Sequence, residues 1–245
     1  MNALALPVGR AEAASAPHIY TRSDWGARPP RRAATVLSTP PDRIVVHHTV
    51  SSNSRDYSAR HAAALSRSIQ RFHMDTNGWD DTGQQFTIGR GGHIMEGRNR
   101  SLAAVLERRH VVGAHTANEN GHTVGIENEG TYISAAPTGA LYRSLIELCA
   151  WLCAVYGLDP QHAIVGHRDY NATACPGDVL YAMLPQLRND VARIGDLRRL
   201  RVRDVGDGPD RESRVPQVAR PERPSGGVVR PYDHGPAVGP EDPTL

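Results

Sequence analysis

Apolar and polar residues alternate along the middle of the chain in blocks that predict strands and helices in turn. The expected elements, in chain order, are a buried strand ending at His47, a helix over 57–76, a hairpin of 85–88 and 93–96, a strand over 123–127, a helix over 138–156, a short strand over 163–165 and a last helix after Asp178. Because strands and helices interleave, we predict an α/β fold, a single domain with a central mixed β-sheet flanked by helices. Polar loops follow two of these strands, so we expect a site in a groove at the strand ends.

The pattern fades at both ends of the chain. Residues 1–18 are alanine-rich, and Ala14-Ser15-Ala16 resembles the end of a secretory leader without the basic and apolar stretches that precede such an end. Beyond about Leu200, Pro, Gly, Arg, Asp and Glu replace the hydrophobic periodicity. We therefore expect a flexible segment over 1–18, one domain over 19–195 and a disordered tail over 196–245.

Composition narrows the function classes. A chain of 245 residues, 39% of them hydrophobic, can bury one substantial core. The formal net charge of +2 argues against a nucleic-acid-binding surface, and we find no apolar run of membrane-spanning length. All 28 basic residues are arginine, so no lysine can act in catalysis. We expect a monomer.

Candidate metal ligands lie in two separate segments. His167 and Cys175 stand eight residues apart in one polar loop, and the apolar strand far upstream ends in His47. Two imidazoles and one thiolate would leave a tetrahedral zinc ion one open position for water, as a hydrolytic site requires. Neither spacing is a recognised ligand pattern, however, and a single histidine is more often a surface or supporting residue.

The two remaining cysteines have a simpler explanation. Cys149 and Cys153 stand four residues apart in an apolar helical stretch, where cysteine usually acts as a small buried hydrophobic residue. A bridge between them, or a metal role, is the alternative.

The order of five motifs resembles that of the zinc-dependent peptidoglycan amidases, a family shared by peptidoglycan recognition proteins and phage lysozyme-amidases. The motifs are Ser23-Asp24-Trp25-Gly26-Ala27-Arg28, Val45-Val46-His47-His48-Thr49, Gly113-Ala114-His115-Thr116, Val124-Gly125-Ile126-Glu127 and the stretch 167–176. The resemblance covers about 21–195. It implies that His47, His167 and Cys175 bind Zn²⁺. It also implies a peptidoglycan or muropeptide substrate, cleaved between the lactyl group of N-acetylmuramic acid and L-alanine of the stem peptide.

One departure from the family concerns proton transfer. Many relatives carry a tyrosine near the zinc where this chain has Gln84, which cannot exchange a proton. Glu127 matches the glutamate that the AmpD-type amidases use as general base, so the resemblance implies that Glu127 accepts and returns the proton. Glu129, two residues further along the chain, is the weaker candidate. A surface pair with an arginine is the alternative for either glutamate.

The resemblance also suggests roles for residues around the zinc. Thr173 stands where relatives have lysine or threonine, and its hydroxyl could donate to the developing oxyanion, although it could also just cap the following turn. His115 is expected to line the substrate groove, with hydrogen bonding to a loop as the alternative. Gln84, Trp79 and His48 are expected beside it among the substrate-binding residues. His48 should point to the opposite face of its strand from His47 and support the site or pack. Gly78-Trp79 looks like the pair associated with meso-diaminopimelate stems.

Two other functions remain compatible with the sequence. The chain could be a recognition module without catalysis, although it retains both Cys175 and Glu127. It could also hold a structural zinc, in which case the ion should have four protein ligands. The substrate class suggests a secreted or cell-wall-associated protein.

Overall fold

The computed structural model describes residues 16–202 and 230–243. Its strands are β1 Ile19–Tyr20, β2 Val36–Leu37, β3 Arg43–His48, β4 Phe86–Ile88, β5 Ile94–Glu96, β6 His110–Val111, β7 Thr123–Asn128 and β8 Ile164–Gly166. Its α-helices are α1 Ala59–Arg71, α2 Ser101–Leu106, α3 Gly139–Tyr156, α4 Pro160–Ala163, α5 Asp178–Ala182 and α6 Leu184–Val202. A π-helical turn, Phe72–Thr76, continues α1, and a 3₁₀ turn, His167–Asp169, follows β8.

A mixed sheet forms the centre of the domain, as predicted. Among the described residues its strand order is β1-β5-β4-β7-β3-β8, and a separate small sheet pairs β2 with β6. Strands β4, β7, β3 and β8 run parallel, whereas β5 pairs antiparallel with β4 in the predicted hairpin. Because β7, β3 and β8 are parallel neighbours, their carboxyl ends and the loops that follow meet at one edge of the sheet.

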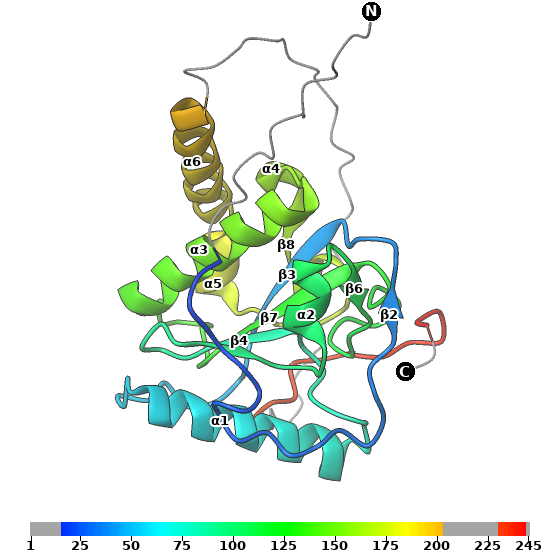
Figure 1. The fold of residues 1–245 in the computed structure, drawn as a ribbon. Helices are drawn as coiled ribbons and strands as arrows, with labels where there is room; N and C mark the ends of the chain where they lie inside the picture. The colour runs from blue at the N-terminus through cyan, green and yellow to red at the C-terminus, as the bar shows by residue number, and fades with distance from the viewer. Residues whose placement is uncertain (1–15, 203–229, 244–245) are drawn as a thin grey trace, which may run out of the picture.

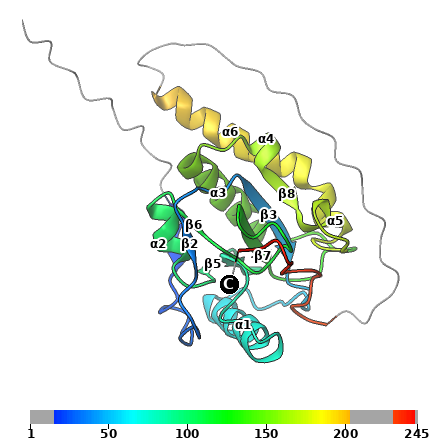
Figure 2. The same ribbon diagram turned by 90° about the vertical axis from the view of Figure 1, so that its right-hand side faces the viewer.

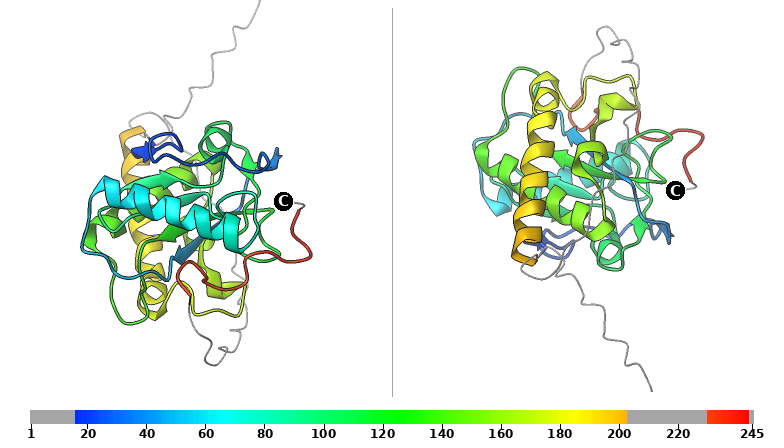
Figure 3. Two further views of the ribbon diagram at one scale, coloured as in Figure 1. Left: turned by 90° about the horizontal axis from the view of Figure 1, so that it is seen from below. Right: turned by 90° about the horizontal axis from the view of Figure 1, so that it is seen from above.

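The two faces of this sheet differ. Ile44, Val46 and Ile126 are fully buried on one face and belong to the main core, together with side chains of α3 and α6. Side chains alternate along a strand, so His47 and Glu127, which are register partners, lie on the other face. Figure 1 shows α3 and α6 on one side of the sheet and α1 on the other, and Figure 3 gives the same layers from below and above.

Helices α1 and α3 lie within the predicted ranges, with the last predicted turn of α1 π-helical. The side chain of Ser58 accepts a hydrogen bond from the backbone N–H of His61 at the start of α1, and Thr138 caps α3 through Leu141 in the same way. The C-cap of α3 is Gly157, in the left-handed conformation at φ 71°.

The predicted last helix is divided in two. Helix α5 ends before Met183 and α6 begins at Leu184. Pro185 has no N–H to donate to the carbonyl of Tyr181, so a continuous helix cannot form through this point. Helix α6 then continues to Val202, beyond the predicted domain boundary at 195.

Part of the expected disordered tail packs on the domain instead. Residues 230–243, red in Figure 2, lie across the sheet edge where β3 and β7 end. The N–H of Tyr232 donates to the carbonyl of Thr49 at 2.9 Å, and Asp242 accepts the N–H of Asn118 at 3.0 Å. Specific hydrogen bonds of this kind do not depend on hydrophobic periodicity, which is why the sequence pattern did not predict them. The rest of the tail, 203–229 and 244–245, and the segment 1–15 lie outside the described residues.

Helix α3 meets a criterion that no segment was expected to meet. Within the described part of the chain it alone is long and apolar enough to cross a membrane, with a mean hydropathy of 1.2 over 18 residues. Leu141, Leu145 and Leu148 are nevertheless fully buried in the main core, and a core helix passes the same test. The helix is therefore only a weak indication of a membrane span.

Candidate metal centre

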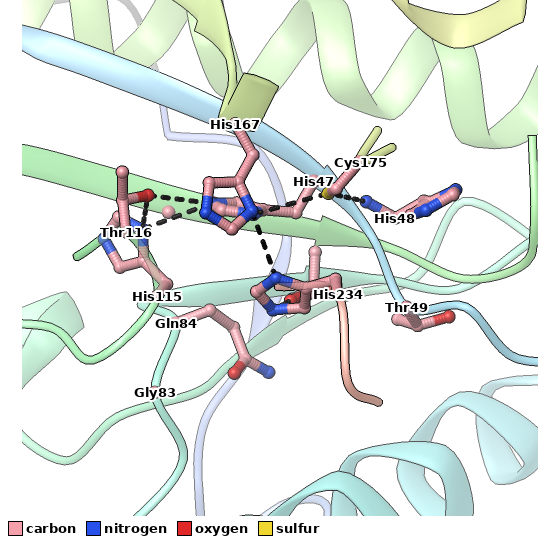
Figure 4. Close-up of polar contacts among 12 residues, drawn as sticks. His47, His48, Thr49, Gly83, Gln84, His115, Thr116, His167, Cys175 and His234 are labelled. Carbon is pink, nitrogen blue, oxygen red and sulfur yellow. Dashed lines mark hydrogen bonds and ion pairs between the residues drawn. The ribbon is translucent and has the colours of Figure 1, made fainter. Parts of the chain in front are cut away.

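Four possible metal ligands converge where β3 and β8 end. His47, His167 and Cys175, the predicted set, lie beside His234 of the C-terminal segment. One ligand atom from each lies within 4.8 Å of all the others, and all four side chains are buried. Figure 4 shows the four side chains pointing toward one another. The fold therefore brings the predicted residues together and adds a fourth.

Each ligand is placed by a separate local structure. His47 is the fifth residue of β3, and His167 opens the 3₁₀ turn directly after β8. The loop that carries Cys175 folds back on this turn, because Arg168 donates its backbone N–H to the carbonyl of Cys175 at 3.1 Å. The Cys175 sulfur accepts the backbone N–H of His48 at 3.4 Å.

Two of the distances between donor atoms match the edges of a tetrahedral zinc site. The Nδ1 atoms of His167 and His234 are 3.3 Å apart, and Cys175 Sγ lies 3.6 Å from His47 Nδ1. Zinc bonds of about 2.0–2.1 Å to nitrogen and about 2.3 Å to sulfur give tetrahedral edges of about 3.3 Å and about 3.6 Å. Imidazole and thiolate are also ligand types that zinc prefers.

A chain of hydrogen bonds directs the lone pair of His47 toward the centre. His115 Nε2 lies 3.3 Å from the carbonyl oxygen of Thr123, which can only accept. His115 therefore carries its proton on Nε2, and its Nδ1 accepts the Nε2 proton of His47 across 3.1 Å. The Nδ1 of His47, on the side of Cys175, is left as an acceptor. Partners of this kind fix the tautomer of a metal ligand.

The other two histidines are held in the same tautomer. His167 Nε2 lies 2.9 Å from the carbonyl oxygen of Pro236 and 3.0 Å from Asn171 Oδ1. His234 Nε2 lies 2.5 Å from Glu127 Oε1. Each ring thus donates from Nε2 and turns an unprotonated Nδ1 toward the shared centre, an arrangement that a cation would stabilise.

Burial determines which of these groups are charged. Burial, followed by the effect of neighbouring His234, lowers the pKa of His167 to about 3, and burial also lowers the pKa of His47. Burial, with Glu127 second, raises the pKa of the Cys175 thiol, so a thiolate there depends on a cation. Burial opposes protonation of His234, but Glu127 outweighs it and raises the net pKa.

His115 lies underneath the centre and not in the groove where we expected it. The ring is fully buried, and it fills space that two glycines leave open. A Cβ on Gly113 would lie 2.5 Å from the His115 ring, and a Cβ on Gly125 would lie 2.6 Å from it. The side chain contacts the carbonyl of Thr123, as the alternative expectation of a hydrogen bond to the backbone had it, and it also contacts His47.

His48 is also inaccessible. Its side chain is buried, and its Nδ1 accepts the backbone N–H of Tyr132 at 3.3 Å. Figure 4 shows its backbone nitrogen in contact with Cys175, while its ring is not among the four converging side chains. The side chain thus supports the loop at Tyr132, and the backbone of His48 supports Cys175.

Of the two glutamates, only Glu127 faces the centre. Its side chain is buried, and its Oε2 has no hydrogen-bond partner within the described part of the chain. Glu129 instead pairs with His61 at 2.6 Å and accepts the backbone N–H of Arg90 at 2.7 Å. A carboxylate with a free oxygen beside a metal centre can exchange a proton with a reacting group.

Thr173 serves two partners at once. Its hydroxyl oxygen accepts the backbone N–H of Cys175 at 3.1 Å, which is the capping role, and it donates to the carbonyl of His234 at 2.5 Å. The same O–H could therefore donate to another carbonyl oxygen at this place.

Gln84 and Trp79 make contacts outside the four-ligand cluster. Gln84 is buried, its amide donates to Thr87 at 2.8 Å, and its Oε1 lacks a partner among the residues the structure describes. Trp79 packs against His73 with ring centroids 4.6 Å apart and the ring planes tilted by 45°. It also lines a cavity of about 290 Å³, which the C-terminal segment closes on its other side.

Sequence reasoning missed His234 entirely. The residue lies in a stretch without hydrophobic periodicity and about sixty residues beyond the nearest motif. One local signal was present: in Pro231-Tyr232-Asp233-His234-Gly235-Pro236 an aromatic residue and a histidine stand between a proline and the turn-forming pair Gly235-Pro236.

The chain is similar in sequence to a family of known enzymes. Residues 37–178 match the profile of the family described as N-acetylmuramoyl-L-alanine amidase. An N-acetylmuramoyl-L-alanine amidase of Sus scrofa is 38% identical over 170 residues, which make up 69% of this chain and 27% of that protein. The chain therefore spans only about a quarter of the length of this relative.

Solved structures share the same fold. The wild-type structure of Drosophila PGRP-LB superposes with a TM-score of 0.60 at 30% identity, over 68% of this chain and 92% of that one. Peptidoglycan recognition protein-LE, solved in complex with tracheal cytotoxin, gives a TM-score of 0.60 at 28% identity over 69% of this chain and 92% of that one. The mixed sheet flanked by helices is thus the fold of these recognition proteins.

Proposed function

Because the chain belongs to the N-acetylmuramoyl-L-alanine amidase family, we propose that it is a zinc amidase of peptidoglycan. The bond cleaved is the amide between the lactyl group of N-acetylmuramic acid and L-alanine of the stem peptide. One observation carries the proposal: His47, His167 and Cys175 converge beside the free oxygen of Glu127. When bound there, zinc supplies a Lewis acid that polarises a carbonyl group and lowers the pKa of water.

The residues around the ligands have separate tasks. Glu127 accepts a proton from the attacking water and returns it to the departing nitrogen, because amide cleavage needs a base and then an acid. Thr173 donates its O–H to the substrate carbonyl oxygen as negative charge develops on it. His115 holds His47 in the tautomer that binds metal.

The substrate is peptidoglycan or a soluble muropeptide, and we propose a preference for diaminopimelate stems. Trp79, of the Gly78-Trp79 pair, lines the cavity next to the centre. Protein-LE, a structural neighbour, was solved with a molecule described as monomeric diaminopimelic acid-type peptidoglycan. Because peptidoglycan lies outside the cell membrane, we place the protein there. Equal turnover of lysine-type and diaminopimelate-type muropeptides would contradict the preference.

The amidase proposal is tested on a defined muropeptide. Purified protein is stripped with a chelator, reloaded with zinc and incubated with N-acetylmuramoyl-tripeptide, and the new amino group of L-alanine is quantified. We expect amine release that the chelator abolishes and zinc restores. Binding of the muropeptide without amine release, in zinc-loaded protein and in the His234→Ala variant alike, would instead identify a recognition module.

A structural zinc site is the second candidate, and one observation favours it. His234 supplies a fourth protein donor, which is the ligand count of a structural site. A fourth ligand from within the domain core would close the centre permanently. His234 comes instead from a separate C-terminal segment, so the centre can lose this donor while the core of the domain stays folded.

A further inference from the structure

The C-terminal segment 230–243 covers the catalytic groups of the proposed amidase. The His234 ring lies 4.7 Å from the ring of His47 and 5.2 Å from that of His167, between centroids. Its Nε2 lies 2.5 Å from Glu127 Oε1, so one of the two oxygens of the proposed base is already engaged. The His234 imidazole therefore lies where a water molecule would have to approach both the metal ligands and Glu127.

The backbone of the segment occupies the substrate side as well. The carbonyl of His234 accepts the O–H of Thr173, the contact that we assign to the substrate carbonyl. The carbonyl of Pro236 accepts from His167 and also from the backbone N–H of Ala117 at 3.2 Å. A peptide strand with this set of contacts has the polar complementarity expected of a bound stem peptide.

We propose that residues 230–243 form an autoinhibitory segment, in which His234 takes the fourth position on the metal and the backbone fills the substrate groove. This inference rests on the proposed amidase function. In the closed form the centre has four protein donors and no position for water. In the open form His47, His167 and Cys175 remain, and Glu127 is released from its contact with His234. Hydrolysis then requires the segment to leave.

Anchors far from the metal hold the segment in place. The Asp242 carboxylate accepts the backbone N–H groups of Asn118 and Asn120 at 3.0 and 2.9 Å, and that of Gly239 at 2.8 Å. The Asn120 side chain donates to the carbonyl of Ala237 at 2.8 Å. These contacts belong to the loop that follows His115, so they can be removed without altering a metal ligand.

Close packing at Gly235 provides a second anchor. Its φ of 119° lies in a region that L side chains rarely adopt, and a Cβ there would come within 2.7 Å of Thr173. A substitution would therefore push the segment away from the centre. Gly195, by contrast, has no atom within 4 Å of a built Cβ and gives a matched glycine control.

The experiment compares full-length variants in three measurements. Asp242→Ala and Gly235→Ala loosen the segment, His234→Ala removes the fourth ligand, and Gly195→Ala and His162→Ala serve as controls. The measurements are kcat/KM on the muropeptide, zinc affinity by chelator competition, and calorimetric binding of the muropeptide to metal-free protein. A synthetic peptide of residues 230–245 is added in trans to His234→Ala.

We expect Asp242→Ala to raise kcat/KM and muropeptide affinity about tenfold, since losing a charged hydrogen bond shifts a two-state equilibrium by about that factor. Gly235→Ala should act in the same direction. His234→Ala should raise kcat/KM at saturating zinc, yet bind zinc about tenfold more weakly or worse, because even the loss of a ligand's partner costs that much. The peptide should inhibit it, and the controls should match the wild type.

Three results would overturn the proposal. If Asp242→Ala and Gly235→Ala bind the muropeptide no better than the wild type, the segment does not cover the groove. If His234→Ala keeps wild-type zinc affinity, His234 is not a ligand. If the fully zinc-loaded His234→Ala variant loses hydrolysis, His234 is a catalytic residue. If no variant releases amine, the amidase function fails, while zinc affinity and muropeptide binding still decide the role of the segment.

Discussion

The two faces of the central sheet, formed by alternate residues of the same strands, differ in role: one packs the apolar core and the other carries the metal centre. In β3, Ile44 and Val46 point into an apolar core that α3 and α6 complete, whereas His47 points to the metal centre on the other face. The apolar face is satisfied by burial alone. The polar face is satisfied only when distant loops supply matching partners, among them the C-terminal segment. Stability and chemistry therefore depend on different faces and can be perturbed separately.

The largest expected effect comes from removing the thiol on the polar face. Cys175→Ala should lose most of its zinc affinity and all measurable hydrolysis, because it removes the one anionic ligand and leaves only imidazoles, one of them on the detachable C-terminal segment. The folded state should remain, since the apolar face is untouched. Zinc content, amine release and circular dichroism together measure this. Cys153→Ala is the matched control, a buried thiol of α3 that should keep its metal; metal loss in both variants would refute the separation of the faces.

Next in size is the removal of the base. Glu127→Gln should retain zinc and lose about 10²- to 10⁴-fold in kcat, the usual range for a positioned proton-transfer group. Glu129→Gln provides the comparison, because that carboxylate pairs with His61 and not with the centre. Single-turnover kinetics on the muropeptide measure the difference. Unchanged kcat in Glu127→Gln would mean that another group accepts the proton.

A core substitution tests the converse case, in which stability falls and the metal centre is left intact. Leu148→Ala on α3 removes a fully buried side chain and should lower the free energy of unfolding by about 2–5 kcal/mol. Zinc affinity at a temperature where the variant is folded should stay at the wild-type level. Leu106, which is 65% exposed, supplies the control, and Leu106→Ala should change little in chemical denaturation. A loss of zinc affinity in folded Leu148→Ala would show that the two faces are coupled.

The smallest predicted effect is a pH dependence away from both faces. Burial lowers the pKa of His122, but hydrogen bonds to Asp42 and Glu119 outweigh burial and raise this pKa overall. A histidine whose folded pKa is raised stabilises the fold below its unfolded pKa of about 6.5, and loses that contribution as the pH rises through the folded pKa. His122→Gln should thus lower Tm at about pH 5.5 and leave it nearly unchanged at about pH 9. Equal losses at both pH values would rule out the ion pairs as the cause.

The apolar face was the easier one to predict from sequence. Hydrophobic periodicity located β3, β7, α1 and α3, because each of these elements repeats its apolar side chains at the period of its own backbone. The division at Met183 was missed, since a single proline overrides an otherwise regular helical pattern.

The polar face could be predicted only in part. The order of the motifs indicated that His47, His167 and Cys175 share one site, but periodicity carries no information about contacts across the chain. His115 was expected in the groove and lies beneath His47, because the glycines that make room for it are not marked by any periodic pattern. His234 was missed for a related reason: its partners lie at least sixty residues away and leave no local pattern.

The most direct test of the metal centre is anomalous diffraction from crystals of the full chain grown with zinc, with data on both sides of the zinc absorption edge. The account predicts one strong peak bonded to His47 Nδ1, His167 Nδ1 and Cys175 Sγ, with His234 Nδ1 as fourth ligand while the C-terminal segment is in place. A fully loaded protein whose zinc lies elsewhere, with these donor atoms bonded to nothing, would contradict it.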